Sequence, residues 1–117
     1  MVSEIGIIHL LDETGQSLRM VSSKGLTPEE IQPIILFPKE SQLAIDVFQQ
    51  EAAIVIPDLA ADPRAPEIAR QATGFPYVGV PIRSKERILG VLSVVKSAGN
   101  IYTEEEVSLL ISTSTLR

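Results

Sequence analysis

Apolar residues gather in two short runs between positions 75 and 96, separated by the polar residues Ser-Lys-Glu-Arg at 84–87. Two runs rich in valine and isoleucine around a short polar loop predict a β-hairpin with a four-residue loop. The second run is mostly apolar on both faces, so we expect both faces of that strand to be covered. Pro81 interrupts the first run. Because proline cannot donate a ladder hydrogen bond, we expect a bulge or a missing hydrogen bond there.

A second hairpin is predicted near the start of the chain, from an apolar run at 5–11 and an alternating run at 17–23. Gly15 can supply a positive φ in the loop between them. The first run is apolar on both faces and should lie inside the sheet, whereas the half-polar second run should lie nearer an edge. Short β-like runs at 34–37 and 53–56 would add further strands.

Three helices are predicted from capping and periodicity. Thr-Pro-Glu-Glu at 27–30 and Thr-Glu-Glu-Glu at 103–106 both fit capping boxes, whose glutamates need no catalytic explanation. The first helix should be short because Pro33 follows within two turns. Residues 41–50 have helical spacing, with Ser41 as the candidate N-cap. In the last helix, an apolar stripe is formed by Val107, Leu110 and Ile111.

The order of these elements predicts an α+β fold with about six strands, antiparallel hairpins at both ends and helices over both faces. The 117 residues fit one domain, spanning 1–117. Strand-like sequence begins within a few residues of Met1, and residues 109–117 stop inside a helical pattern without a glycine stop signal. We therefore expect the chain to be a domain excised from a longer protein.

Composition narrows the partners and the chemistry. The net charge of −5 and the pI of about 4.8 offer no phosphate-neutralising surface, so we expect no nucleic-acid partner and no membrane contact. The chain has no cysteine, which excludes disulfides, thiolate catalysis and cysteine zinc sites. It also lacks a secretory signal and a run of 18 apolar residues, and we expect a cytoplasmic location.

Segments spread along the chain resemble, in the same order, the GAF domain family. They are Ile-His-Leu-Leu-Asp at 8–12, Leu-Arg-Met-Val-Ser-Ser-Lys-Gly-Leu at 18–26, Ile-Val-Ile-Pro-Asp-Leu at 54–59, Asp-Pro-Arg at 62–64, Val-Gly-Val-Pro-Ile at 78–82, Ile-Leu-Gly-Val-Leu-Ser-Val at 88–94 and Ile-Tyr-Thr-Glu-Glu-Glu at 101–106. The family's long first helix is absent, its last helix is truncated, and glycines usual after its third strand are replaced around 38–41. The last departure affects one wall of the family's pocket.

The resemblance implies a GAF-like, PAS-related six-stranded antiparallel sheet with helices on both faces, and a pocket between the sheet and the middle helices and loops. Family members are sensory or regulatory modules of histidine kinases, cyclases, phosphodiesterases and transcription regulators. Some bind cyclic nucleotides, linear tetrapyrroles, haem or small metabolites, and many only dimerise. The sequence lacks the Asn-Lys, Phe and Asp-Glu signature of cyclic-nucleotide binders. With no cysteine, we expect no covalently attached chromophore and no thiol-based reductase activity.

Six residues flank the implied pocket and are our candidate ligand-binding residues: Phe37, Phe48, Asp58, Arg64, Phe75 and Tyr77. Aromatic side chains could line an apolar site, and Arg64 suits an anionic group. For the aromatic residues, the favoured alternative is an ordinary core position. For the polar residues, it is that Asp58 and Asp62 cap turns while Arg64 is solvated. Tyr77 stands out because its hydroxyl needs a partner.

His9 is the single histidine, and it lies inside an apolar run. It could ligate haem or act as a base, but we favour a buried, hydrogen-bonded structural histidine. No metal site is expected, because a single imidazole without cysteines has no suitable partner.

Two functions remain open after these exclusions. The first is a non-catalytic sensory module that binds a small-molecule effector and signals to an output domain such as a histidine kinase, cyclase or phosphodiesterase. Its parent would be a sensor histidine kinase or a cyclic-di-GMP enzyme. The alternative is a ligand-free module that forms a homodimer through its terminal helices. The sequence leaves the effector, and any non-covalent cofactor, unidentified.

Overall fold

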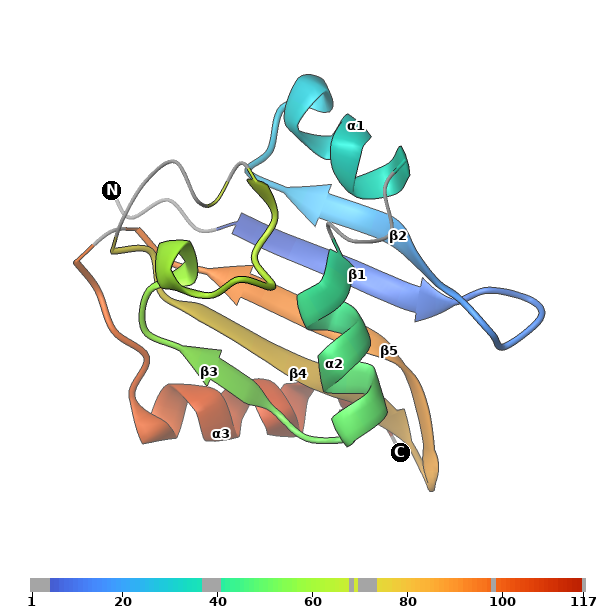
Figure 1. Cartoon of the computed structure of the whole chain (residues 1–117). Helices are drawn as coiled ribbons and strands as arrows, with labels where there is room; N and C mark the ends of the chain where they lie inside the picture. Colours follow the sequence, from blue (N-terminus) through green and yellow to red (C-terminus); the bar gives the residue numbers. More distant parts are fainter. Residues whose placement is uncertain (1–4, 37–40, 68, 70–73, 98, 117) are drawn as a thin grey trace.

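The computed structural model describes residues 5–36, 41–67, 69, 74–97 and 99–116, which form one sheet with helices on both faces (Figure 1). The strands are β1 (Ile5–Leu11), β2 (Leu18–Lys24), β3 (Ile54–Ile56), β4 (Tyr77–Ser84), β5 (Arg87–Val95) and β6 (Thr115–Leu116). The helices are α1 (Pro28–Leu36), α2 (Gln42–Gln50), α3 (Glu104–Thr113) and the 3₁₀ helix η2 (Leu59–Ala61). No helix among the described residues is long and apolar enough to cross a membrane.

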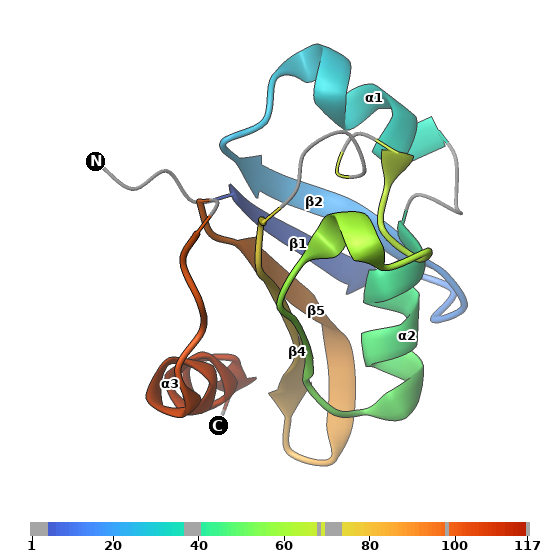
Figure 2. The ribbon, with the colours of Figure 1, turned by 60° about the vertical axis from the view of Figure 1, so that its left-hand side comes forward.

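The sheet has the strand order β2-β1-β5-β4-β3, with every neighbouring pair antiparallel, and β6 adds to β4 in parallel. Figure 2 shows α1, α2 and η2 on one side of this sheet and α3 on the other. The predicted α+β class and the two-sided cover are therefore confirmed. As expected, β1 lies inside the sheet and β2 lies at its edge.

Both predicted hairpins form, but one loop is shorter than expected. In the first hairpin, Gly15 adopts the positive φ of 73° that its loop requires. In the second, Ser84 pairs with Arg87, so the loop contains two residues and not four. Lys85 makes the tighter turn because its φ of 57° lies in the left-handed region, which a lysine was not expected to adopt.

The sheet accommodates Pro81 in the expected way. β4 shifts its register against β5 between Ile82 and Arg83, directly after the proline. On its other side, β3 pairs with β4 only as far as Gly79, and β6 begins pairing at Arg83. On that edge of β4, Pro81 therefore lies in the gap between the residues that pair with β3 and those that pair with β6. The missing backbone donor of proline is tolerated in such a gap.

Capping explains where α1 and α3 begin. The backbone N–H of Thr27 donates to the Glu30 carboxylate at 2.8 Å, and the backbone N–H of Glu30 donates to the Thr27 hydroxyl at 3.2 Å. Thr103 and Glu106 make the same reciprocal pair at 3.0 and 3.1 Å. Both predicted capping boxes are thus confirmed, and they satisfy backbone donors that would otherwise lack partners.

Two predicted boundaries are wrong. The β-like run at 34–37 begins as helix, because α1 continues through Pro33 to Leu36. Proline fits helical φ and costs one backbone hydrogen bond, while the longer helix buries Ile34, which is 7% exposed. Near the other end, the helical pattern expected over 109–117 ends early: α3 ends at Thr113, and the backbone N–H of Arg83 donates to the Ser114 carbonyl, leading into β6.

The core is divided between the two faces of the sheet. On the α2 face, Ala44 and Val47 pack against Val91, while Leu43, Ile56, Leu59 and Ala65 surround Tyr77. On the opposite face, Val78 and Val80 are fully buried. Alternation along β4 thus gives each face its own apolar row, as the sequence pattern predicts.

Candidate functional site

A cavity of about 220 Å³ lies on the α1–α2 face of the sheet. Its walls come from three parts of the chain: β1 and β5, the start and middle of α1, and the segment that follows β3. The lining residues are Ile5, Ile7, Leu26, Glu30, Ile34, Leu59, Pro66, Ala69, Phe75 and Val95. All except Glu30 are apolar, so this outer chamber offers an apolar surface to an occupant.

A smaller chamber of about 60 Å³ adjoins it. The two chambers share six lining residues, and we therefore treat them as one cavity: Ile5, Ile7, Ile34, Leu59, Pro66 and Val95. The inner chamber adds the polar residues His9, Ser41, Tyr77 and Ser93. The cavity is thus apolar toward its outer end and polar at its inner end.

Tyr77 and Ser93 form one polar pair of the inner chamber. Their hydroxyl oxygens are 2.9 Å apart, and both residues are buried. The Tyr77 ring lies along its own strand over Gly79, where a β-carbon would come within 2.3 Å of the tyrosine hydroxyl. Burial raises the pKa of Tyr77 to about 12, so the phenol is neutral at physiological pH.

His9 and Ser41 form the second polar pair. His9 Nε2 lies 3.2 Å from the Ser41 hydroxyl oxygen, and its Nδ1 is buried with no hydrogen-bond partner among the described residues. Burial lowers the pKa of His9, which keeps the imidazole neutral. His9 is therefore buried and hydrogen-bonded, as expected. Ser41 occupies the N-cap position of α2, but its side chain makes no capping bond, and its hydroxyl contacts His9.

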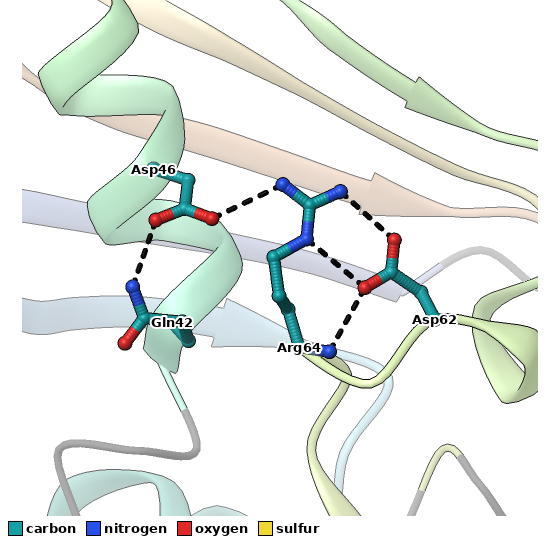
Figure 3. A network of polar contacts seen from close by, with 4 residues as sticks. All are labelled: Gln42, Asp46, Asp62 and Arg64. Carbon is teal, nitrogen blue, oxygen red and sulfur yellow. Dashed lines mark hydrogen bonds and ion pairs between the residues drawn. The ribbon is translucent and has the colours of Figure 1, made fainter.

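Arg64 connects α2 to the loop after η2 (Figure 3). Its guanidinium donates to Asp46 at 3.1 Å and to Asp62 at 2.8 and 3.0 Å. Gln42 donates to the other oxygen of Asp46 at 2.7 Å. The guanidinium holds the pKa of Asp62 below its usual range, and the two carboxylates raise the pKa of Arg64. The expected solvated arginine is therefore wrong: Arg64 is committed to two carboxylates.

Asp58 binds backbone N–H groups of the same region through its carboxylate. Its carboxylate accepts hydrogen bonds from the backbone N–H groups of Ala60 at 3.1 Å and Gly74 at 3.0 Å. It therefore caps η2 and ties it to the residues that lead into β4. This is the turn-capping role that Asp-rich loops favour.

The six candidate residues do not converge on one point. Phe75 lines the outer chamber and Tyr77 lines the inner one. Phe48 lines a larger hollow of about 530 Å³ beside α2 and the β1–β2 hairpin, and this hollow shares His9, Ile34 and Ser41 with the inner chamber. Asp58 and Arg64 are not among the described residues that line the two-chambered cavity, and Phe37 lies outside the described residues.

Sequence reasoning missed the part of the cavity that β1 and α1 contribute. Ile5, Ile7 and His9 fall at period two and share one face of β1, which was a readable signal. Leu26 and Ile34 gave no comparable signal. Leu26 is a single leucine in a loop, and Ile34 was assigned to a strand.

The family model for the GAF domain matches residues 1–116 of this chain. Among curated proteins, the Nif-specific regulatory protein of Herbaspirillum seropedicae is 32% identical over 111 residues. That match covers 89% of this chain and 20% of the relative, so the chain spans about a fifth of the curated relative's length.

Solved structures give the same fold. The GAF domain of an Acinetobacter phosphoenolpyruvate-protein phosphotransferase superposes with a TM-score of 0.69 at 27% identity, covering 94% of this chain and 65% of that one. The type II free methionine-R-sulfoxide reductase of Thermoplasma acidophilum superposes with a TM-score of 0.73 at 12% identity, covering 94% and 72%. At that identity, the second likeness concerns the fold alone.

Proposed function

Because this chain belongs to the GAF domain family, we propose that it is a non-catalytic sensory module that binds a small-molecule effector in the two-chambered cavity. The observation that carries the proposal is the cavity itself, which has apolar walls and four polar side chains at one end. Sites for small molecules have this composition. The curated relative, a regulatory protein, supports a regulatory role.

The position of the cavity suggests how binding would be transmitted. An occupant would contact Leu26 and Ile34 on the α1 side and Leu59 and Phe75 on the opposite wall. The second wall is joined to α2 through Arg64. If a ligand binds more tightly when these walls have one spacing than when they have another, it raises the population of the domain with the first spacing. The size of that shift is set by the ratio of the two affinities. An attached output domain, such as a histidine kinase, cyclase or phosphodiesterase, would receive that shift in the cytoplasm.

The proposal assigns no reaction to this domain. The chain has no cysteine, so the thiol chemistry of fold relatives such as sulfoxide reductases is unavailable to its own residues. The carboxylate pairs of α1 and α3 are explained by helix capping. The polar residues of the inner chamber are two serines, a neutral histidine and a neutral tyrosine, which suit hydrogen bonding.

Native mass spectrometry of the purified chain tests this function. The folded protein is weighed, then denatured, and any released molecule is weighed in the same experiment. The expected result is a small molecule of defined mass, bound at up to one per chain and released in smaller amount from an Ile7→Phe variant, whose larger ring narrows the cavity. A molecule that is released equally from wild type and Ile7→Phe would contradict a site in this cavity.

A second function, ligand-free dimerisation, is favoured by exposed apolar side chains on α3. Of the stripe predicted there, Val107 and Leu110 are partly buried, whereas Ile111 is 39% exposed and its neighbour Leu109 is 67% exposed. Sedimentation of wild type and Leu109→Glu tests it. A homodimer through α3 predicts a dimer that Leu109→Glu dissociates, and a wild type that stays monomeric at high micromolar concentration would contradict it.

A further inference from the structure

We propose that the ligand of the two-chambered cavity is a small uncharged molecule, with an apolar body in the outer chamber and one hydrogen-bonding group in the inner chamber. A primary alcohol, a phenol or a simple amide has this chemistry. The inference rests on the proposed sensory function and specifies its ligand class. It is supported by the size of the cavity, the charges around it and the unused hydrogen-bonding capacity at its inner end.

Size sets the first limit. The chambers hold about 220 and 60 Å³. An apolar cavity of about 150 Å³ accommodates benzene, so the two chambers together suit a molecule of roughly ten non-hydrogen atoms. A nucleotide, a haem or a linear tetrapyrrole is far larger. The two chambers by themselves therefore favour a single ring or a short branched chain, and a larger ligand would have to extend past His9 and Ser41 into the hollow that Phe48 lines.

Charge sets the second limit. Among the described lining residues, Glu30 is the one charged side chain, and its carboxylate already accepts the Thr27 backbone N–H at 2.8 Å. Arg64 is held by Asp46 and Asp62 and is not one of those lining residues. An anionic group inside the two chambers would lose its hydration without meeting a described cation, because Arg19 lines the adjoining hollow and not the chambers.

The inner chamber supplies the hydrogen-bonding group's partners. Each serine hydroxyl can donate one hydrogen bond and accept two, and the pairs Tyr77–Ser93 and His9–Ser41 use only part of that capacity. Nδ1 of His9 has no partner among the described residues. Burial keeps His9 and Tyr77 neutral, so the chamber can bind a hydroxyl or amide without acquiring a charge of its own.

Four probes of nearly equal shape test the class: benzyl alcohol, benzoate, benzylammonium and toluene. Calorimetric titration at neutral pH should give the tightest binding for benzyl alcohol. Benzoate and benzylammonium should bind at least about tenfold more weakly, because they must be desolvated without an opposite charge. Toluene should bind roughly three- to tenfold more weakly than benzyl alcohol, the loss expected for one hydrogen bond.

A matched pair of variants locates the binding. Ile7 lines both chambers, and its neighbour Ile8 points to the opposite face of β1, where it pairs with Leu92 of β5. Ile7→Phe should weaken benzyl alcohol binding at least about tenfold, because the larger ring takes part of the space shared by both chambers, while Ile8→Phe should leave the affinity within about twofold of wild type. Circular dichroism spectra that match wild type show that both variants fold.

The outcomes separate the ligand class from the proposed function. If benzoate or benzylammonium binds more tightly than benzyl alcohol and Ile7→Phe weakens that binding while Ile8→Phe does not, the cavity is a site but the uncharged class is wrong. If no probe binds at about 10 mM, or if Ile8→Phe and Ile7→Phe behave alike, the inference fails, and the mass-spectrometric test still decides the sensory function independently.

Discussion

Gly79 lies beside the inner chamber at a point where a single added methyl group would meet filled space. A β-carbon at Gly79 would lie 2.3 Å from the Tyr77 hydroxyl oxygen and 2.8 Å from Cγ2 of Val47. Val47 is fully buried and Tyr77 is 4% exposed, so neither side chain has room to withdraw without disturbing the core. Gly79→Ala should therefore displace the Tyr77 ring and break its hydrogen bond to Ser93.

The expected cost follows from two losses. Overpacking a tight core costs about 1–3 kcal/mol. Breaking the buried Tyr77–Ser93 hydrogen bond costs about 1–3 kcal/mol more. Alanine recovers roughly 0.5–1 kcal/mol over glycine in a strand, because it restricts the unfolded chain. Gly79→Ala should thus lower the free energy of unfolding by about 1–5.5 kcal/mol, a large part of a typical domain's stability at the upper end.

Urea unfolding of four proteins measures this cost and its cause: wild type, Gly79→Ala, Tyr77→Phe and the double variant. Tyr77→Phe removes the oxygen that lies closest to the added methyl group, so Gly79→Ala should cost about 1–2 kcal/mol less in that background. Gly6→Ala is the matched control, because a β-carbon at Gly6 meets nothing within 4 Å. It should raise the free energy of unfolding by roughly 0.5–1 kcal/mol, the gain expected for alanine over glycine inside a strand such as β1.

Two results would refute this reasoning. Equal costs of Gly79→Ala in the wild-type and Tyr77→Phe backgrounds would show that the hydroxyl is not what the methyl group meets. If Gly79→Ala lowered the free energy of unfolding no more than Gly6→Ala does, the space over Gly79 would not be tightly filled.

Three further outcomes are expected. Burial lowers the pKa of His9 in the folded state, so the unfolded chain takes up this proton at a higher pH than the folded chain does. The free energy of unfolding should therefore fall by up to about 1.4 kcal/mol as the pH drops from 7.5 to 5.5. Urea unfolding at several pH values measures this loss, which should be absent from His9→Gln. A double-mutant cycle of Arg64→Gln and Asp46→Asn should give a coupling of about 0.5–1 kcal/mol that shrinks with salt, since the side chains are 32% and 20% exposed. Thr103→Ala should cost about 1 kcal/mol in thermal unfolding by removing the cap of α3, whereas Thr103→Ser should restore it.

Local chemistry explains which parts of the fold were predictable. Both hairpins, the span of α2 and both capping boxes depend on neighbouring residues, and the sequence pattern located each of them. The errors arose where distant contacts overrode a local rule. Helix α1 continues past Pro33, and this longer helix buries Ile34. The hydroxyl of Ser41 contacts His9 of β1 and makes no capping bond to α2.

The candidate site was less predictable, because its walls come together only in the folded chain. Phe75 and Tyr77 were found from the central hairpin, and they line the two chambers. The commitment of Arg64 to Asp46, 18 positions away, cannot be recognised from local spacing. The contribution of Leu26 was likewise hidden, because a single leucine in a loop before a helix carries no periodicity.

The central claim is that a ligand occupies the space between α1, η2 and β1, and intermolecular NMR contacts test it most directly. With the isoleucine methyl groups labelled and benzyl alcohol bound, the account predicts nuclear Overhauser effects from the ring to Ile5, Ile7 and Ile34. Ile111, exposed on α3, serves as the internal control and should show none. Contacts to Ile111 with none to the three cavity isoleucines would contradict the account.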